Sequence, residues 1–184
     1  LPGLAKTRAI KALSKNLDCG LSRIQFTPDL LPSDVTGTEI YVPNEKEKFV
    51  FQKGPIFSNL ILADEINRAP AKVQSALLEA MEERQVTVEG ETRALPEPFF
   101  VIATQNPFEF EGTYSLPESQ LDRFLLRISM GYPDEGFERE LLTSHREGEP
   151  VEHLQAVLTS GDVLQLQKQA RQVRVDDALT DYIL

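Results

Sequence analysis

The sequence predicts an α/β fold in which a parallel sheet carries helices on its faces and leads into an all-helical tail. Largely apolar segments at 58–64, 99–104 and 125–130 are typical of strands buried on both faces. Segments with helical periodicity lie between them, and such alternation favours a layered fold with a parallel sheet. Strand patterns are absent from the last part of the chain. We therefore expect residues 1–133 to form the core domain, and 134–184 to form a linker and part of a small helical domain.

Weaker patterns place the remaining elements. Near the N-terminus, apolar residues recur at helical spacing, at Ala9, Ile10, Leu13 and Leu17. Residues 21–26 have the pattern of a strand with Ile24 and Phe26 on one face, and 27–41 that of a loop with two prolines. The other expected elements are a helix at 71–84, a hairpin at 85–95, a short helix at 118–124, and tail helices at 137–145, 160–171 and 176–184, the last two capped by Ser160 and Asp176.

The charge of the chain is strongly acidic, since 19 basic and 29 acidic residues give a net charge of −10. Broad binding to nucleic acid depends on Lys and Arg, so this balance argues against it, although not against a local basic groove. No apolar run approaches the length that a bilayer span requires. The single cysteine, Cys19, excludes an intrachain disulfide, which suits a reducing cytoplasm. No histidine lies near it in the sequence to activate it, and we interpret it as structural.

The first residues resemble part of a phosphate-binding loop. Such a loop needs a tight turn whose N–H groups face the anion, a lysine for the terminal phosphates and a hydroxyl for Mg²⁺, with a helix directly after it. Lys6, Thr7 and the helix that follows supply three of these parts. Two features depart from the pattern: Ala5 stands at its second glycine, and its first glycine would precede residue 1. On its own, the fragment is equally compatible with an ordinary turn.

An acid pair follows the apolar strand at 60–64. Asp64 and Glu65 stand where a parallel sheet places its ligands, at the carboxyl end of a strand. Asp64 could hold Mg²⁺ through water, and Glu65 could polarise an attacking water. The alternative is a pair of acids that caps the next helix.

Two further polar residues are candidates with strong alternatives. Asn106 follows the strand at 99–104 and could orient a water or touch a phosphate, but Asn-Pro is also a common turn dipeptide. Arg123 could stabilise charge during phosphoryl transfer, or could be a structural arginine paired with Asp122 or Glu118.

In this order, the four pieces resemble the AAA+ ATPases, and in detail the MoxR family. The resemblance covers nearly the whole chain and is weakest from about 147 to 166. The matching motifs are Gln25 to Gly37, Ala63 to Pro70, Ala103 to Pro107, Leu116 to Glu118 and Leu121 to Phe124. It implies a three-layer P-loop NTPase fold that continues into a helical lid domain.

The resemblance also implies a role for each candidate residue, with ATP and Mg²⁺ as cofactors. The Walker A loop corresponds to Pro2, Gly3, Leu4, Ala5, Lys6 and Thr7, with Lys6 on the phosphates and Thr7 on Mg²⁺. Asp64 is then the second Mg²⁺ ligand and Glu65 the catalytic base. Asn106 matches sensor 1. Arg123 matches the arginine finger, which acts on ATP bound to the neighbouring subunit of a ring, usually a hexamer.

Family members suggest partners as well. Relatives are chaperone-like ATPases that remodel or activate proteins or help insert metal cofactors, often beside proteins with von Willebrand factor A domains. The alternatives are a related AAA+ machine, such as a magnesium chelatase subunit or a nucleic-acid translocase, and a nucleotide-binding scaffold without turnover. The hairpin at 85–95 sets Arg84 and Arg93 among Glu89, Glu91 and Glu97, a poor DNA surface.

Relatives further carry a strand before the phosphate loop and a second arginine motif, sensor 2, after a helix like 176–184. A parallel sheet that lacks an inner strand leaves backbone groups and apolar side chains unpaired. We therefore expect the printed sequence to be partial, to fold poorly by itself and to hydrolyse little ATP.

Overall fold

A computed structural model describes the backbone of residues 6–43, 49–105, 114–129, 136–137, 139 and 150–183. The side chains of Lys6 and Thr7 are outside the described part. Among the residues it does describe, no helix is long and apolar enough to cross a membrane.

The centre of the molecule is a parallel sheet of three strands in the order β1-β4-β7. These strands are β1 (Leu21–Gln25), β4 (Leu60–Asp64) and β7 (Phe100–Ala103). Gln25 is in register with Asp64, and Ala63 with Ala103, so the carboxyl ends of all three strands lie at one edge. This arrangement confirms the predicted parallel sheet and places β4 between β1 and β7.

Helices cover both faces of the sheet. On one face, Ile61 and Ala63 of β4 belong to the main core with Leu77 and other residues of α3 (Ala71–Glu83). On the other face, Leu60 and Leu62 pack with Ile10 of α1 (Lys6–Asn16). Because side chains alternate along a strand, β4 is buried on both sides, which accounts for its continuously apolar sequence. The three-layer prediction is therefore confirmed.

Two antiparallel hairpins extend this core. The hairpin at 85–95 is present as β5 (Gln85–Val88) and β6 (Glu91–Ala94). The loop predicted at 27–41 is wrong, because it contains the short helix α2 (Pro32–Thr36) and β2 (Gly37–Tyr41), which pairs with β3 (Phe49–Lys53). Gly37 permits this change of direction, since it has φ 96° and a Cβ there would lie 2.3 Å from the Gln52 carbonyl oxygen.

The third buried strand predicted at 125–130 is also wrong for the part that is described. Residues 126–129 have no regular secondary structure, and Leu125, Leu126 and Ile128 are 92%, 77% and 80% exposed. A buried strand needs a partner for its N–H and C=O groups. Within the described residues, β7 is bonded to β4 alone, and no strand pairs with 126–129.

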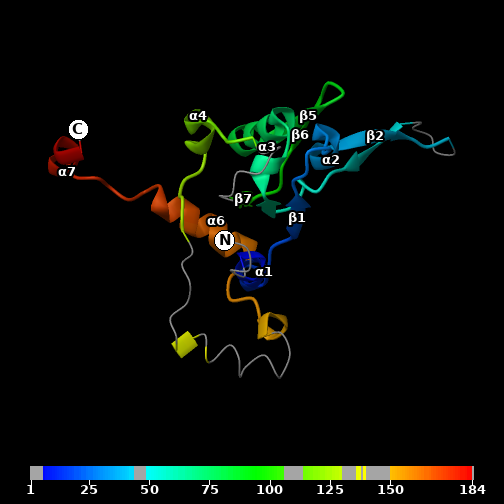
Figure 1. Ribbon diagram of the computed structural model, residues 1–184. Coiled ribbons are helices and arrows are strands. Elements are labelled where there is room, and N and C mark those ends of the chain that lie inside the picture. The colour runs from blue at the N-terminus through cyan, green and yellow to red at the C-terminus, as the bar shows by residue number, and fades with distance from the viewer. Residues whose placement is uncertain are drawn as a thin grey trace.

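The tail contains the expected helices at its end, which lead away from the sheet (Figure 1). They are α6 (Ser160–Ala170) and α7 (Asp177–Ile183), and the 3₁₀ helix η3 (Pro150–His153) precedes them. The cap of α6 is Thr159 rather than Ser160, because the Thr159 side chain accepts the Asp162 N–H. Most of the helix expected at 137–145 lies outside the described residues. The division at residue 133 stays a prediction.

Contacts between the tail and α1 are made by backbone groups. The N–H groups of Val157 and Leu158 both donate to the Asn16 carbonyl oxygen at the C-terminal end of α1. Cys19 lies close by, with its Sγ 3.4 Å from the Ser160 hydroxyl. The two N–H bonds satisfy the Asn16 carbonyl, which has no partner within α1 because it lies in the last turn.

Candidate functional site

The candidate site lies at the carboxyl end of β4, where the chain turns sharply. Asp64 ends the strand, and its side chain is 16% exposed. Glu65 follows with φ 56° and ψ 50°, the left-handed region, and leads into the 3₁₀ helix η1 (Ile66–Arg68). A non-glycine residue in this region costs on the order of 1–3 kcal/mol, so neighbouring groups must hold it there. The two acids therefore emerge next to each other from a turn that is under strain.

Thr104, directly after β7, supplies that support. Its hydroxyl donates to Asp64 Oδ1 at 2.6 Å and accepts the Glu65 N–H at 2.9 Å. Its backbone adds two bonds, because its N–H donates to the Ala63 carbonyl and its carbonyl accepts the Ile66 N–H. Thr104 is 9% exposed, so water competes little for these groups. One residue next to the neighbouring strand thus binds the turn through its side chain and its backbone.

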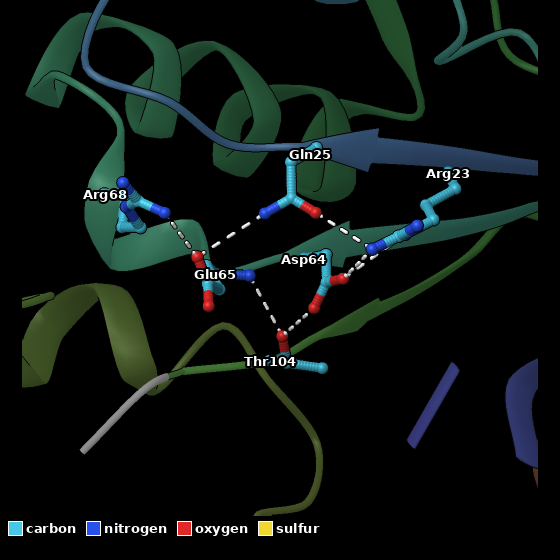
Figure 2. A network of polar contacts seen from close by, with 6 residues as sticks. All are labelled: Arg23, Gln25, Asp64, Glu65, Arg68 and Thr104. Carbon is cyan, nitrogen blue, oxygen red and sulfur yellow. Dashed lines mark hydrogen bonds and ion pairs between the residues drawn. The ribbon is translucent and has the colours of Figure 1, made fainter. Parts of the chain in front are cut away.

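Two arginines and a glutamine face the acids from the other sides (Figure 2). Arg23 of β1 reaches Asp64 Oδ2 through Nη2 at 2.6 Å and through Nε at 3.2 Å. Arg68 of η1 donates to Glu65 Oε2 at 2.9 Å, and the Gln25 amide reaches the same oxygen at 3.5 Å. Each acid therefore holds a guanidinium group, which shows that this edge of the sheet attracts cations.

Of the predicted site residues, the structure brings Asp64 and Glu65 together. Five others lie outside the described residues: Pro2, Gly3, Leu4, Ala5 and Asn106. Lys6 begins α1, which packs through Ile10 on β4, the strand that carries both acids. Since the side chains of Lys6 and Thr7 are not described, their distance from Asp64 stays a prediction.

Arg123 pairs with an acid from another element. Its Nη2 lies 3.1 Å from Glu82 Oε2 of α3. The partner in this ion pair is therefore Glu82 and not Asp122 or Glu118, the acids considered from the sequence. The pair lies on a hollow between α3 and α4 (Glu118–Leu121). Both side chains are partly exposed, at 39% and 58%, so the guanidinium remains within reach of solvent. This position leaves the finger assignment open.

Sequence reasoning missed the residues that surround the acids: Arg23, Gln25, Arg68 and Thr104. A signal was available for the pair on β1, because Arg23 and Gln25 are two residues apart and so share a face at the end of a strand. Thr104 gave a weaker signal, since it is one of two polar residues between an apolar strand and Asn106.

A parallel sheet with helices on both faces, whose inner strand ends at Asp64 with Glu65 directly after it, agrees with the fold class of the P-loop nucleoside triphosphatases. A family model described as the ATPase family associated with various cellular activities (AAA) matches residues 1–126. A protein from Mycobacterium tuberculosis named Chaperone MoxR1 is 50% identical over 184 residues, and two proteins named MoxR are 31% and 29% identical over 136 residues. The chain belongs to the AAA ATPase family and, within it, to the MoxR family.

Two further relatives match the chain from end to end. The uncharacterized protein YeaC of Bacillus subtilis is 52% identical over 184 residues, which are 57% of its length. A crystal structure from Cytophaga hutchinsonii has a TM-score of 0.86 at 49% identity and is covered to 55%. Since 48% of the mycobacterial protein is covered, the chain spans about half the length of these relatives.

Proposed function

We propose that the chain is the nucleotide-hydrolysing part of a Mg²⁺-dependent, ring-forming ATPase. The observation that carries the proposal is the pair Asp64 and Glu65, held side by side at the carboxyl end of β4 by Thr104. Membership of the AAA family supports ATP as the substrate. The acids differ in their surroundings, because Asp64 is the more buried of the two. This difference suits two separate roles.

Asp64 fits a role on the metal. Mg²⁺ in such sites takes one or two carboxylates and completes its shell with phosphate oxygens and water. Among the described residues, no group of three or more acids, histidines or cysteines is placed to hold an ion by itself, which agrees with a metal that arrives with its nucleotide. The Arg23 guanidinium on Asp64 Oδ2 shows that a positive charge is accommodated there. Bound Mg²⁺ would neutralise charge on the phosphates, with Thr7 as its second protein ligand.

Glu65 fits a role on water. Its carboxylate is 29% exposed and turned by the left-handed backbone away from the strand direction. A carboxylate in this place can accept a proton from a water that attacks the γ-phosphate in line. Lys6 would bind the phosphates and Asn106 would orient the same water. Arg123 would stabilise the charge that develops in the transition state.

The ring part of the proposal depends on Arg123. A finger that acts on a neighbouring subunit must be exposed, and the described guanidinium is partly so. A homo-oligomeric ring, with six subunits as the expected number, would bring it to the adjacent nucleotide. In that arrangement Glu82 holds the guanidinium in place until the neighbour binds ATP.

The proposed client is a protein, and a partner with a von Willebrand factor A domain is our first candidate. A relative is named a chaperone, and a net charge of −10 disfavours nucleic acid. The hairpin β5–β6 adds to this argument, because Arg93 is engaged by Glu91 at 2.6 Å and lies over the Phe51 ring. A magnesium chelatase-type subunit or a nucleic-acid translocase remains the alternative. Metal cofactor insertion and a cytoplasmic location also belong to the proposal.

The experiment compares Glu65→Gln with Glu83→Gln, which removes an exposed acid from the end of α3. Both are made in the protein that carries this chain with its flanking residues. We expect Glu65→Gln to bind Mg²⁺–ATP as the parent does and to lose at least about 100-fold in turnover, because a positioned base contributes about that much. Glu83→Gln should match the parent. Parental turnover in Glu65→Gln would contradict the proposal.

A further inference from the structure

The hydroxyl of Thr104 forms a hydrogen bond with each of the two acids of the candidate site. It donates its proton to Asp64 Oδ1 and accepts the Glu65 N–H with its oxygen. A hydroxyl has one proton to donate, so the carboxylate oxygen and the N–H are recognised at the same time and from fixed directions. A change at residue 104 should therefore affect both acids together.

The backbone bonds of Thr104 are independent of the bonds made by its hydroxyl. Its N–H bond to the Ala63 carbonyl and its carbonyl bond from the Ile66 N–H do not involve the side chain. A substitution keeps both of these bonds and keeps β7 paired with β4. The hydroxyl can thus be removed while the sheet and the frame of the turn stay in place.

What the hydroxyl adds is orientation. Asp64 can rotate about its side-chain bonds, and the contact at Oδ1 leaves Oδ2 directed at the exposed side, where Arg23 meets it. Glu65 has a left-handed backbone that its N–H bond to Thr104 holds. Without the hydroxyl, the carboxylate of Asp64 gains freedom and the Glu65 turn loses a restraint.

On these grounds we propose that Thr104 is a positioning residue, whose hydroxyl orients Asp64 toward the metal and Glu65 toward the attacking water. The proposal rests on the ATPase function proposed above and deepens it. Groups that orient the ligands of a metal typically change metal affinity or activity by about 10–100-fold when they are removed. Thr104 would act through the two acids, and it is not assigned a contact with substrate.

Three variants of the full protein isolate the hydroxyl: Thr104→Val, Thr104→Ser and Thr104→Ala. Valine keeps the shape of threonine without the hydroxyl, and the Ser–Ala pair differs in the hydroxyl alone. The control is Ser58→Ala, which removes a hydrogen bond of 2.7 Å between the hydroxyls of Ser58 and Ser22 near the amino ends of β4 and β1. Thermal unfolding of every variant shows whether it is folded.

Two measurements are made on each variant. Electron paramagnetic resonance follows the binding of Mn²⁺ to the protein loaded with ADP, which reports the metal site without turnover. Steady-state hydrolysis of ATP is then measured across a range of Mg²⁺ concentrations, and binding of ATP in EDTA is measured as a metal-free reference.

We expect the Val and Ala variants to bind Mn²⁺ about 10-fold more weakly and to lose about 10–100-fold in kcat. Thr104→Ser and Ser58→Ala should stay within about threefold of the parent. Binding of ATP in EDTA should change less than about twofold in every variant, because phosphate contacts do not pass through Thr104. This split between metal-dependent and metal-free binding would not arise from a general loss of stability.

Other results would contradict the proposal. If the parent is active and Thr104→Val has the same Mn²⁺ affinity and kcat as the parent, the positioning role is refuted and the ATPase function still stands. A parent protein that neither hydrolyses ATP nor binds metal with nucleotide would refute the ATPase function itself. If Thr104→Val and Thr104→Ala are unfolded while Thr104→Ser is folded, the hydroxyl serves the fold, and the proposal is equally refuted.

Discussion

Arg23 Nη2 lies 2.6 Å from Asp64 Oδ2, so a guanidinium group from β1 forms an ion pair with the carboxylate at the end of β4. The pair is not a directly opposed one, because Gln25 stands opposite Asp64 in the register and Arg23 reaches across diagonally. Arg23 is half exposed, and an exposed pair of this kind is worth about 1 kcal/mol or less. A divalent cation can therefore displace it at little cost.

From this geometry we predict that Arg23→Gln strengthens metal binding. Removal of the guanidinium beside Asp64 Oδ2 removes a competing positive charge and lowers the repulsion of an arriving cation. An interaction of up to about 1 kcal/mol corresponds to at most about fivefold in affinity. Titration of Mn²⁺ into the ADP-loaded protein measures the change.

The control for this prediction is Arg174→Gln, which removes an exposed arginine between α6 and α7. It should leave Mn²⁺ affinity unchanged. Weaker metal binding in Arg23→Gln would contradict the interpretation, since it would mean that the arginine orients Asp64 and does not compete with the metal.

A second prediction concerns Lys6. The resemblance assigns its ammonium group to the phosphates, and a hydrogen bond to a charged group contributes about 1.5–3 kcal/mol. Lys6→Ala should weaken ATP binding by about 10–100-fold, as measured with a fluorescent ATP analogue in the full protein.

Lys11→Ala is the matched control, because Lys11 lies on the same helix and is exposed. It should bind ATP like the parent. If both variants bind ATP equally well, the phosphate loop is not at the start of α1.

A third prediction separates an arginine that acts on the neighbouring subunit from one that acts within its own chain. Arg123→Ala should bind ATP normally and lose about 10³-fold or more in turnover, the usual contribution of an arginine finger. Glu65→Gln should also be inactive. Mixed in one ring, the two variants place an intact Glu65 beside an intact Arg123 at some interfaces.

Mixing should therefore restore turnover well above that of either variant alone, in an assay that follows phosphate release after subunit exchange. Glu82→Gln, which removes the partner of Arg123, should keep most of the parental turnover because it leaves the finger present. A mixture as inactive as its components would show that Arg123 acts within its own subunit or is structural.

A fourth prediction concerns the start of α6. Two hydrogen bonds lower the pKa of Asp162 below its ordinary value of 3.8. The larger effect comes from the Thr159 hydroxyl and the smaller from the Thr159 N–H, and both donate to the Asp162 carboxylate. A lowered pKa in the folded state means that the ionised carboxylate contributes stability above pH 3.8. This contribution is lost as the pH falls through the lower pKa of the folded state.

Amide hydrogen exchange of Asp162 and Val163 should therefore quicken, relative to the intrinsic rate, as the pH falls below about 3.8. Asp162→Asn should remove this pH dependence. Protection that stays constant to lower pH in the parent protein would show that the capping box does not hold the helix start.

The sequence was sufficient to predict the inner strands β4 and β7, because each is an apolar run with a polar residue at its end or directly after it, Asp64 and Thr104. It was also sufficient to place Asp64 and Glu65 at one edge. The hairpin β2–β3 was not predictable in the same way, because Gly37 and two prolines near it have the composition of a loop and the pairing depends on a segment further along the chain.

The prediction of a buried strand at 125–129 was wrong because it relied on composition alone. The apolar composition of these residues predicts burial, but burial depends on a neighbouring strand, which local patterns do not supply. The contacts of Thr104 and Arg23 were hidden for a similar reason, because they join strands that lie about 40 residues apart in the chain.

The most direct test of the central claim is a crystal structure of the full protein with Mg²⁺ and a non-hydrolysable ATP analogue. The claim predicts one Mg²⁺ ion, with the Thr7 hydroxyl at about 2.1 Å and Asp64 bound to it directly or through a water. Glu65 should lie beside the γ-phosphate and Arg23 should have left Asp64 Oδ2. A Mg²⁺–nucleotide bound elsewhere, with Asp64 still paired to Arg23, would contradict the account.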